Sequence, residues 1–159
     1  MSFKDQSWNS RFAQMGDQAE AQFVDWMENV VKAGYVRFGL DRPPIAVHML
    51  PLKLRYTPDF LTSKRLYEVK GFGRDRIAKV KIENRDALWD WDDDMPTRMF
   101  FYNSTDHMAW TVNVNSAEWR NCDVASFPEG KDYFEVTYGW LDTYGEQVTI
   151  RSRDDQAGF

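Results

Sequence analysis

The segment TPDFLTSKRLYEVKG, residues 57–71, decides the fold expected for this chain. It follows Leu52–Tyr56, in which apolar and polar side chains alternate with period two, and this pattern predicts a strand leading into Thr57–Phe60. The same alternation returns over Arg65–Lys70, and Leu61–Lys64 is expected to form the turn between the two runs. The segment therefore predicts an antiparallel β-hairpin.

Asp59, Glu68 and Lys70 are the chemically informative side chains of this hairpin. Glu68 and Lys70 are two residues apart and project from the same face of a strand, and the turn returns Glu68 close to Asp59. Two carboxylates at close range repel each other, and Mg²⁺ or Mn²⁺ would relieve that repulsion because carboxylate oxygens suit these ions. A neighbouring lysine can orient a water or offset charge on a phosphate. For Glu-x-Lys alone, the alternative interpretation is a surface ladder of ion pairs.

A helix over Gly16–Ala33 is predicted by apolar residues at helical spacing, with Gly34 placed to end it. On a helical wheel, Glu20 lies at the centre of an apolar arc formed by Phe23, Val24, Met27 and Val31. A carboxylate on a buried helix face is costly unless a partner or a metal lies near it. The alternative is a glutamate tolerated in the first turn, where the helix dipole favours negative charge.

The order of these motifs resembles the PD-(D/E)xK nuclease superfamily. A helix carrying Glu20 precedes Pro58-Asp59, and Glu68-Val69-Lys70 follows after eight residues. Thr57–Leu61 followed by Tyr67–Gly71 is most similar to phage enzymes of the endonuclease I type, which resolve Holliday junctions, and also to transposon-end nucleases. The resemblance implies a restriction-endonuclease-like core.

The resemblance also assigns roles over residues 16–103. It implies a Mg²⁺ site, in which Mn²⁺ can substitute, with these ligands: Asp59, Glu68, Glu20 and the backbone carbonyl of Val69. Lys70 would be the catalytic lysine. Because the junction-resolving enzymes are usually basic, the acidic total charge of this chain departs from their pattern.

Charge is distributed unevenly along the chain. The 20 basic and 25 acidic residues give a net charge of −5, yet residues 64–85 contain eight basic and three acidic side chains. This window is expected to bind the DNA backbone from a helix over Arg74–Trp91. The expected DNA-binding residues are Arg74, Arg76, Lys79, Lys81 and Arg85.

The rest of the pattern predicts an α/β fold in one domain, residues 1–159, with a central mixed β-sheet flanked by helices. The motif core is expected to span about residues 16–103 and a β-rich extension about residues 105–159. Further elements are expected as strands over Met99–Tyr102, Trp110–Val114, Tyr133–Trp140 and Gln147–Arg151, and a short helix over Ser116–Arg120.

Together these features predict a Mg²⁺-dependent endonuclease that hydrolyses phosphodiester bonds in DNA, with branched or distorted DNA as the substrate. The alternative is a nuclease-fold module that binds DNA or a protein without cleaving. Because no run of about 20 apolar residues occurs and residues 1–6 lack the pattern of a secretory signal, we expect a cytoplasmic protein, in the host cytoplasm if a phage encodes it. The sequence leaves a homodimer open.

Overall fold

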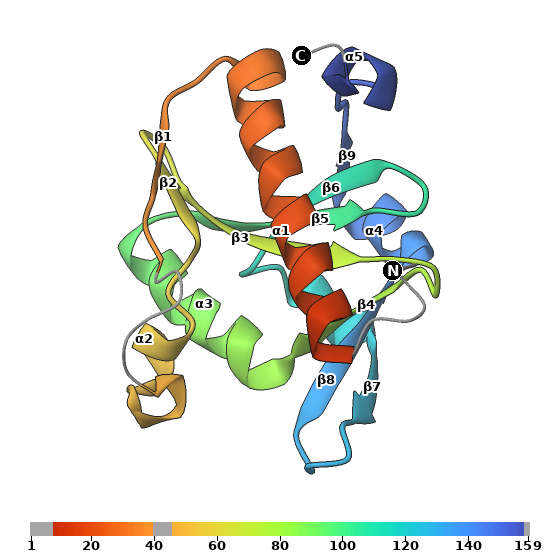
Figure 1. The fold of residues 1–159 in the computed structure, drawn as a ribbon. Coiled ribbons are helices and arrows are strands. Elements are labelled where there is room, and N and C mark those ends of the chain that lie inside the picture. Colours follow the sequence, from red (N-terminus) through yellow and green to blue (C-terminus); the bar gives the residue numbers. More distant parts are fainter. Residues whose placement is uncertain (1–7, 40–45, 158–159) are drawn as a thin grey trace.

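The computed structural model describes residues 8–39 and 46–157, and Figure 1 shows their arrangement. The helices are α1 (Trp8–Trp26), α2 (Leu52–Arg55), α3 (Ile82–Asp94), α4 (Tyr138–Tyr144) and α5 (Arg153–Ala157), with shorter helical turns η2 (Met27–Val31), η3 (Val47–Met49) and η4 (Ala117–Asn121). The strands are β1 (Tyr35–Arg37), β2 (Phe60–Thr62), β3 (Leu66–Phe72), β4 (Ile77–Lys81), β5 (Thr97–Asn103), β6 (Met108–Asn113), β7 (Asp123–Ser126), β8 (Asp132–Thr137) and β9 (Glu146–Val148).

The larger of the two sheets is mixed, with the strand order β1-β2-β3-β5-β6-β9. Its strands β3 and β5 run parallel, in a register that pairs Glu68 with Met99, and the other neighbouring strands are antiparallel. The connection between these parallel strands contains β4 and α3. β4 joins β8 and β7 in a second, antiparallel sheet. The expected α/β architecture, a central mixed sheet flanked by helices, is confirmed.

α1 covers one face of the large sheet, where it lies across β3 and β5 (Figure 1). Its buried side chains are Ala19, Phe23 and Trp26, and Phe23 stacks on the ring of Phe60 at 4.7 Å between centroids. Gly71 on β3 permits the close approach, because a Cβ at this position would lie 2.3 Å from the carbonyl oxygen of Met15. Any larger residue would force α1 away from the sheet.

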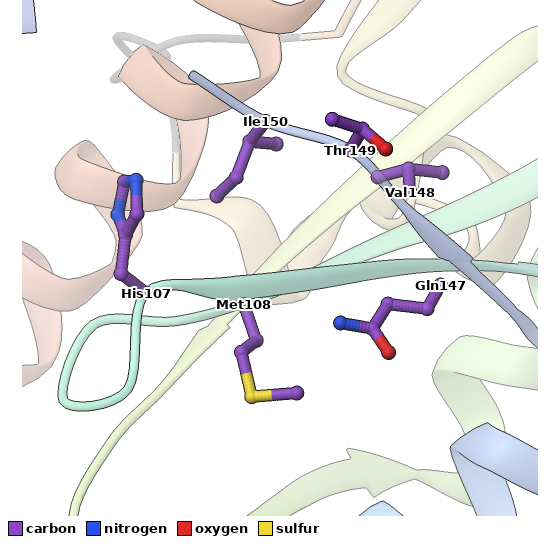
Figure 2. A pocket seen from close by; sticks show the side chains of 6 residues that line it. All are labelled: His107, Met108, Gln147, Val148, Thr149 and Ile150. Atoms are coloured by element: carbon purple, nitrogen blue, oxygen red, sulfur yellow. The ribbon is translucent and has the colours of Figure 1, made fainter. Parts of the chain in front are cut away.

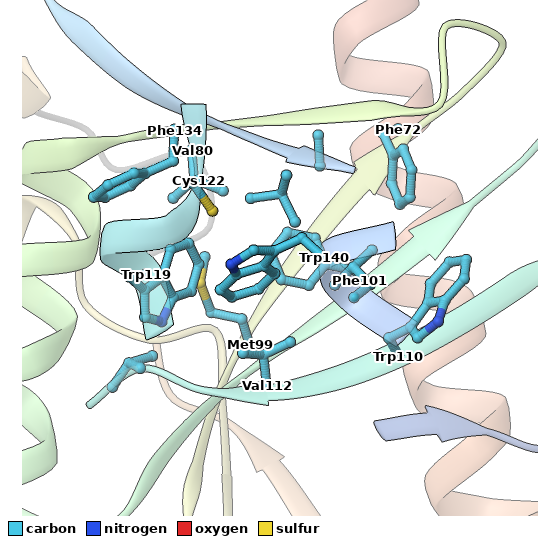
Figure 3. Packing of buried hydrophobic residues seen from close by; sticks show 14 of the residues in the cluster. Phe72, Val80, Met99, Phe101, Trp110, Val112, Trp119, Cys122, Phe134 and Trp140 are labelled. Atoms are coloured by element: carbon cyan, nitrogen blue, oxygen red, sulfur yellow. The ribbon is translucent and has the colours of Figure 1, made fainter. Parts of the chain in front are cut away.

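The opposite face of the large sheet packs against α3, α4 and the small sheet around a cluster of aromatic side chains (Figure 3). The indole N–H groups of its three tryptophans are all satisfied, Trp110 by Asp142, Trp119 by the carbonyl of Asn113 and Trp140 by the carbonyl of Glu118. Each large side chain buried in such a cluster contributes about 1.5–3 kcal/mol. This cluster, which includes Phe72 of β3, therefore stabilises the position of that strand.

The prediction for the first strand of the hairpin is wrong. Leu52–Tyr56 does not form a strand, and Leu52 and Leu54 are 40% and 47% exposed rather than buried on one face of a sheet. Instead, α2 forms there and docks on α3, since the indole of Trp91 donates to the carbonyl of Lys53 at 2.9 Å. The strand that pairs with β3 begins only at Phe60, so Asp59 precedes a strand rather than ending one.

The helix expected over Arg74–Trp91 is also wrong in its first half. Residues 77–81 form β4, which inserts Ala78 and Val80 into the aromatic cluster and pairs with β8. Ile77 and Val80 have helical spacing, whereas Ala78, Val80 and Ile82 alternate with period two, and pairing with a distant strand decides between the two patterns. The helix begins at Ile82.

The other expected elements are present, but their first or last residues differ from the prediction. The first helix begins at Trp8 and its last turn is η2, which ends at Lys32 in the left-handed conformation (φ 57°) rather than at Gly34. The strand expected over Tyr133–Trp140 stops at Thr137, whose hydroxyl caps α4 by accepting from the N–H of Trp140. No helix in the described part of the chain is long and apolar enough to span a membrane.

Candidate active site

Asp59 lies at the point where the pairing of β2 with β3 ends. β2 pairs with β3 only through Phe60–Tyr67 and Leu61–Leu66, and the next N–H on that edge of β3, from Val69, donates to the Asp59 carboxylate at 2.8 Å. Because the N–H and C=O of a strand residue face the same neighbour, the carbonyl of Val69 is directed to the same side as Asp59. One carboxylate and one backbone carbonyl therefore face a common side at this edge.

Glu68 is a buried carboxyl, only 6% exposed, and it lies close enough to Asp59 for that acid to affect its pKa. Burial raises the pKa of Glu68 well above its ordinary value, and the charge of Asp59 raises it further. The charge of Lys70 acts in the opposite direction and lowers this pKa. The hairpin thus brings the two carboxyl groups together, as its spacing predicts.

Lys70 follows Glu68 on the same face of β3. The alternating residues Tyr67 and Val69 pack in the cluster under α1, so Glu68 and Lys70 project from the other face. Lys70 is half-buried, and it lies close enough to Glu68 to affect its pKa. A buried acid, a second acid and a lysine therefore lie together at the middle of β3.

Glu20 does not lie at the centre of the buried face of α1, and that expectation is wrong. The buried arc is centred on Ala19, Phe23 and Trp26, whereas Val31 is 44% exposed, so Glu20 lies at the margin of the arc. Its carboxylate binds the Arg37 guanidinium at 2.7 Å. The Glu20 charge still acts on Glu68, although it is the weakest of the named influences on that pKa.

The acidic side chains of the site form a pair rather than a triplet. Within residues 8–39 and 46–157, no group of three or more His, Cys, Asp or Glu side chains is placed to hold a metal ion. The pair formed by Asp59 and Glu68 nevertheless suits Mg²⁺, which commonly binds through one or two carboxylates and fills its remaining positions with water and phosphate oxygens. The residues present therefore fit a hard divalent cation.

Two residues near the site were missed by the sequence analysis. Arg37 on β1 contacts Glu20 and lies 3.9 Å from Asp59, and Tyr56 donates to Glu83 on α3 at 2.6 Å. Burial raises the pKa of Tyr56, and the neighbouring Glu83 raises it further. Neither residue belongs to a motif with fixed spacing, so only their proximity in the fold could reveal them.

The five expected DNA-binding residues do not lie on one helix face. Arg76 makes a two-pronged contact with Asp106, with nitrogen–oxygen distances of 2.7 and 3.1 Å. The Arg85 side chain is only 12% exposed and its guanidinium lies over the rings of Trp89 and Phe134. These two arginines are engaged with other groups of the protein, so their role in DNA binding stays a prediction.

The other three expected DNA-binding residues are distributed over a turn and a strand. Arg74 is exposed in the turn before β4. Lys79 and Lys81 alternate on the outer face of β4, and the Lys79 ammonium lies 5.4 Å from the ring centre of Tyr133. Arg74, Lys79 and Lys81 therefore remain candidates for phosphate contacts.

No family model and no curated protein sequence matches this chain. Among solved structures, its fold is similar to that of Archaeoglobus fulgidus Hjc, a Holliday junction resolvase from an archaeal hyperthermophile. The two share 12% sequence identity with a TM-score of 0.49, over 80% of this chain and 94% of the other. This likeness concerns the fold alone, so the assignment of the site depends on its own side chains.

A hollow of about 420 Å³ lies at the opposite end of the large sheet, next to β6 and β9 (Figure 2). His107, Met108 and residues 147–150 line it. Both ring nitrogens of His107 are engaged there, with the hydroxyl of Tyr102 at 2.8 Å and the carbonyl of Arg151 at 2.7 Å. None of the candidate catalytic side chains lines this hollow, so it is separate from the site.

Proposed function

We propose that this protein is a metal-dependent endonuclease that hydrolyses phosphodiester bonds in DNA. One observation carries the proposal: the buried carboxyl of Glu68 lies near a second acid, Asp59, which accepts from the N–H of Val69, and Lys70 is on the same face of the same strand. Like charges placed together in a fold cost stability, and such an arrangement is typical of a functional site. The resemblance of the motifs to PD-(D/E)xK nucleases supports the same chemistry.

Asp59 and Glu68 would hold Mg²⁺, with the carbonyl of Val69 as a further ligand on the same side of β3. When bound, Mg²⁺ supplies a Lewis acid that polarises a phosphate oxygen and lowers the pKa of a coordinated water. Lys70 donates hydrogen bonds from a positive ammonium beside this position, where it orients the attacking water and offsets the charge that develops on the phosphate. The burial of Glu68 excludes bulk water and strengthens these interactions.

The substrate we propose is branched or distorted DNA, and this choice comes from the resemblance of residues 57–71 to junction-resolving endonucleases. Arg74, Lys79 and Lys81 would contact the phosphate backbone on either side of the cleaved bond. A two-fold dimer would match the symmetry of a four-way junction, because its two active sites could cut two strands.

The test is to incubate the purified chain with linear duplex, single-stranded, flapped and four-way-junction DNA, each with Mg²⁺ and with EDTA. We expect Mg²⁺-dependent cleavage, fastest on the junction, that is lost in Asp59→Asn and Glu68→Gln. Arg98→Gln is the matched control, because it changes the charge of the same sheet at a residue bonded to Thr111 and Glu146. Tight DNA binding without cleavage would instead establish the non-cleaving binding module.

A further inference from the structure

Arg37 lies between two of the acids at the candidate site. On β1 it pairs with Phe60 of β2, the residue that follows Asp59, and its side chain lies on the same sheet face as the Phe60 ring. Its guanidinium is 2.7 Å from a carboxylate oxygen of Glu20 and 3.9 Å from a carboxylate oxygen of Asp59. The central carbon of the guanidinium also lies 5.1 Å from the ring centre of Phe60.

These contacts hold a permanent positive charge beside the two acids at the middle of β3. An arginine stays protonated at any pH at which the protein is folded, and its planar group can engage two carboxylates at once. The ring of Phe60 beneath it supports the same position through a cation–π contact. Glu20 and Asp59 come from distant segments, so the guanidinium is what links α1 to the carboxylate pair.

A divalent cation needs some of the same carboxylate oxygens. A cation that binds Asp59 together with Glu68 would be repelled by the guanidinium, and one that also used Glu20 would have to displace it. We propose that Arg37 is a built-in counter-ion that competes with the divalent cation for Asp59 and Glu20 and so sets the metal affinity of the site. This inference deepens the proposed function and rests on its metal site.

A purely structural role for Arg37 makes a different prediction. Arg37 and Glu20 are each about one-third exposed, and ion pairs of this exposure contribute about 0–1 kcal/mol to stability. If the guanidinium only fastened β1 to α1, its removal would lower the melting temperature slightly and leave the metal affinity unchanged or weaker. Competition predicts that removal strengthens metal binding.

The experiment is to titrate Mn²⁺ into the whole chain without DNA, by isothermal titration calorimetry, for wild type, Arg37→Gln and Arg98→Gln. We expect Arg37→Gln to bind Mn²⁺ more tightly by about threefold or more, since it removes one positive charge within a few ångströms of the ion. Arg98→Gln removes an equal charge from the same sheet and should leave the affinity unchanged. Equal or weaker binding by folded Arg37→Gln would overturn the competition.

A second measurement uses the wild-type protein and needs no folded glutamine variant. The Arg37 side-chain Nε–H signal in the NMR spectrum, assigned by its loss in Arg37→Lys, should move towards the position of a solvated guanidinium as Mg²⁺ is added. A signal that stays in place at saturating Mg²⁺ would contradict displacement.

These outcomes separate the two proposals. Normal cleavage with unchanged Mn²⁺ affinity in Arg37→Gln would refute only the role of Arg37. A second outcome is that no DNA is cleaved, while Mn²⁺ binding depends on Asp59 and Glu68 and tightens in Arg37→Gln. This outcome would refute the endonuclease activity and support the competition between Arg37 and the cation. Absence of Mn²⁺ binding in every variant would refute both.

Discussion

Asp25 and Glu68 are two mostly buried acids with opposite surroundings. Asp25, on α1, accepts hydrogen bonds from Arg151 through Nε and Nη2, and these bonds lower its pKa. Glu68, on β3, faces Asp59, and both its burial and that second acid raise its pKa. One acid is neutralised by a cation and the other is placed against a like charge.

The opposite surroundings of Asp25 and Glu68 indicate different roles for the two regions. The ion pair of Asp25 and Arg151 fastens the C-terminal segment after β9 to α1, so its charges add stability in the folded state. The meeting of Glu68 and Asp59 costs stability, and a fold retains such a cost where the charges do chemistry. Four measurements test whether the two acids have these different roles.

The largest effect is expected on catalysis. Glu68→Gln and Asp59→Asn should each lower the Mg²⁺-dependent cleavage rate about a hundredfold or more, because each removes a charge on which the metal site depends. Single-turnover cleavage of four-way-junction DNA measures this rate. Asp25→Asn is the matched control at the other acid, and cleavage that falls as far in this folded variant would remove the functional distinction between the two acids.

The second effect is a gain in stability. In EDTA at neutral pH, Glu68→Gln should raise the melting temperature by about 2–4 °C for each 1 kcal/mol of repulsion and desolvation removed. A carboxyl whose pKa is raised by folding is protonated in both states at low pH, and its folded form loses stability as the pH rises through the raised pKa. The gain should therefore grow from pH 5 to pH 8 in differential scanning calorimetry. A variant less stable than wild type at pH 8 would contradict this account.

Substitution of Asp25 is expected to lower the stability of the protein, whereas substitution of Glu68 is expected to raise it. Asp25→Asn should lower the unfolding free energy by about 1 kcal/mol, because it removes the carboxylate charge to which Arg151 donates. The lowered pKa of Asp25 means that this contribution is present above its ordinary value of 3.8 and is lost as the pH falls through the lowered pKa. Urea denaturation should give a constant difference from pH 8 to pH 5. A difference that disappears already at pH 5 would disagree with the strong pairing.

The smallest effect is expected on the salt dependence of DNA binding. Basic residues that are paired within the protein should differ in this respect from basic residues that face outward. Lys79→Ala should reduce the slope of log K against log salt for duplex DNA by about 0.9, the loss of one phosphate contact. Arg76→Ala should leave that slope unchanged, because Arg76 already binds Asp106 through two nitrogens. Fluorescence anisotropy over a salt series distinguishes them, and equal slope changes would place both residues on the DNA.

The hairpin was predictable because its pairing is local. Asp59 and Glu68 are nine positions apart, and a short turn between two strands brings such residues together whatever the rest of the chain does. The error over Leu52–Tyr56 arose because alternation predicts a strand only if a sheet is present to bury the apolar side chains. The same ambiguity hid β4, which forms because β8, more than 50 residues later, pairs with it.

The sequence alone determined the mixed α/β architecture, the first helix and the side-by-side placement of Asp59 and Glu68 near Lys70, since each depends on periodicity or short spacing. Three features become visible in the tertiary structure alone: Glu20 binds Arg37, Arg76 binds Asp106, and residues 77–81 form a strand. Those outcomes depend on groups 17 to 60 positions apart in the chain. Electrostatic and sheet contacts at such separations are fixed by how the elements pack, because no local pattern in the chain specifies which distant group will fill a given position.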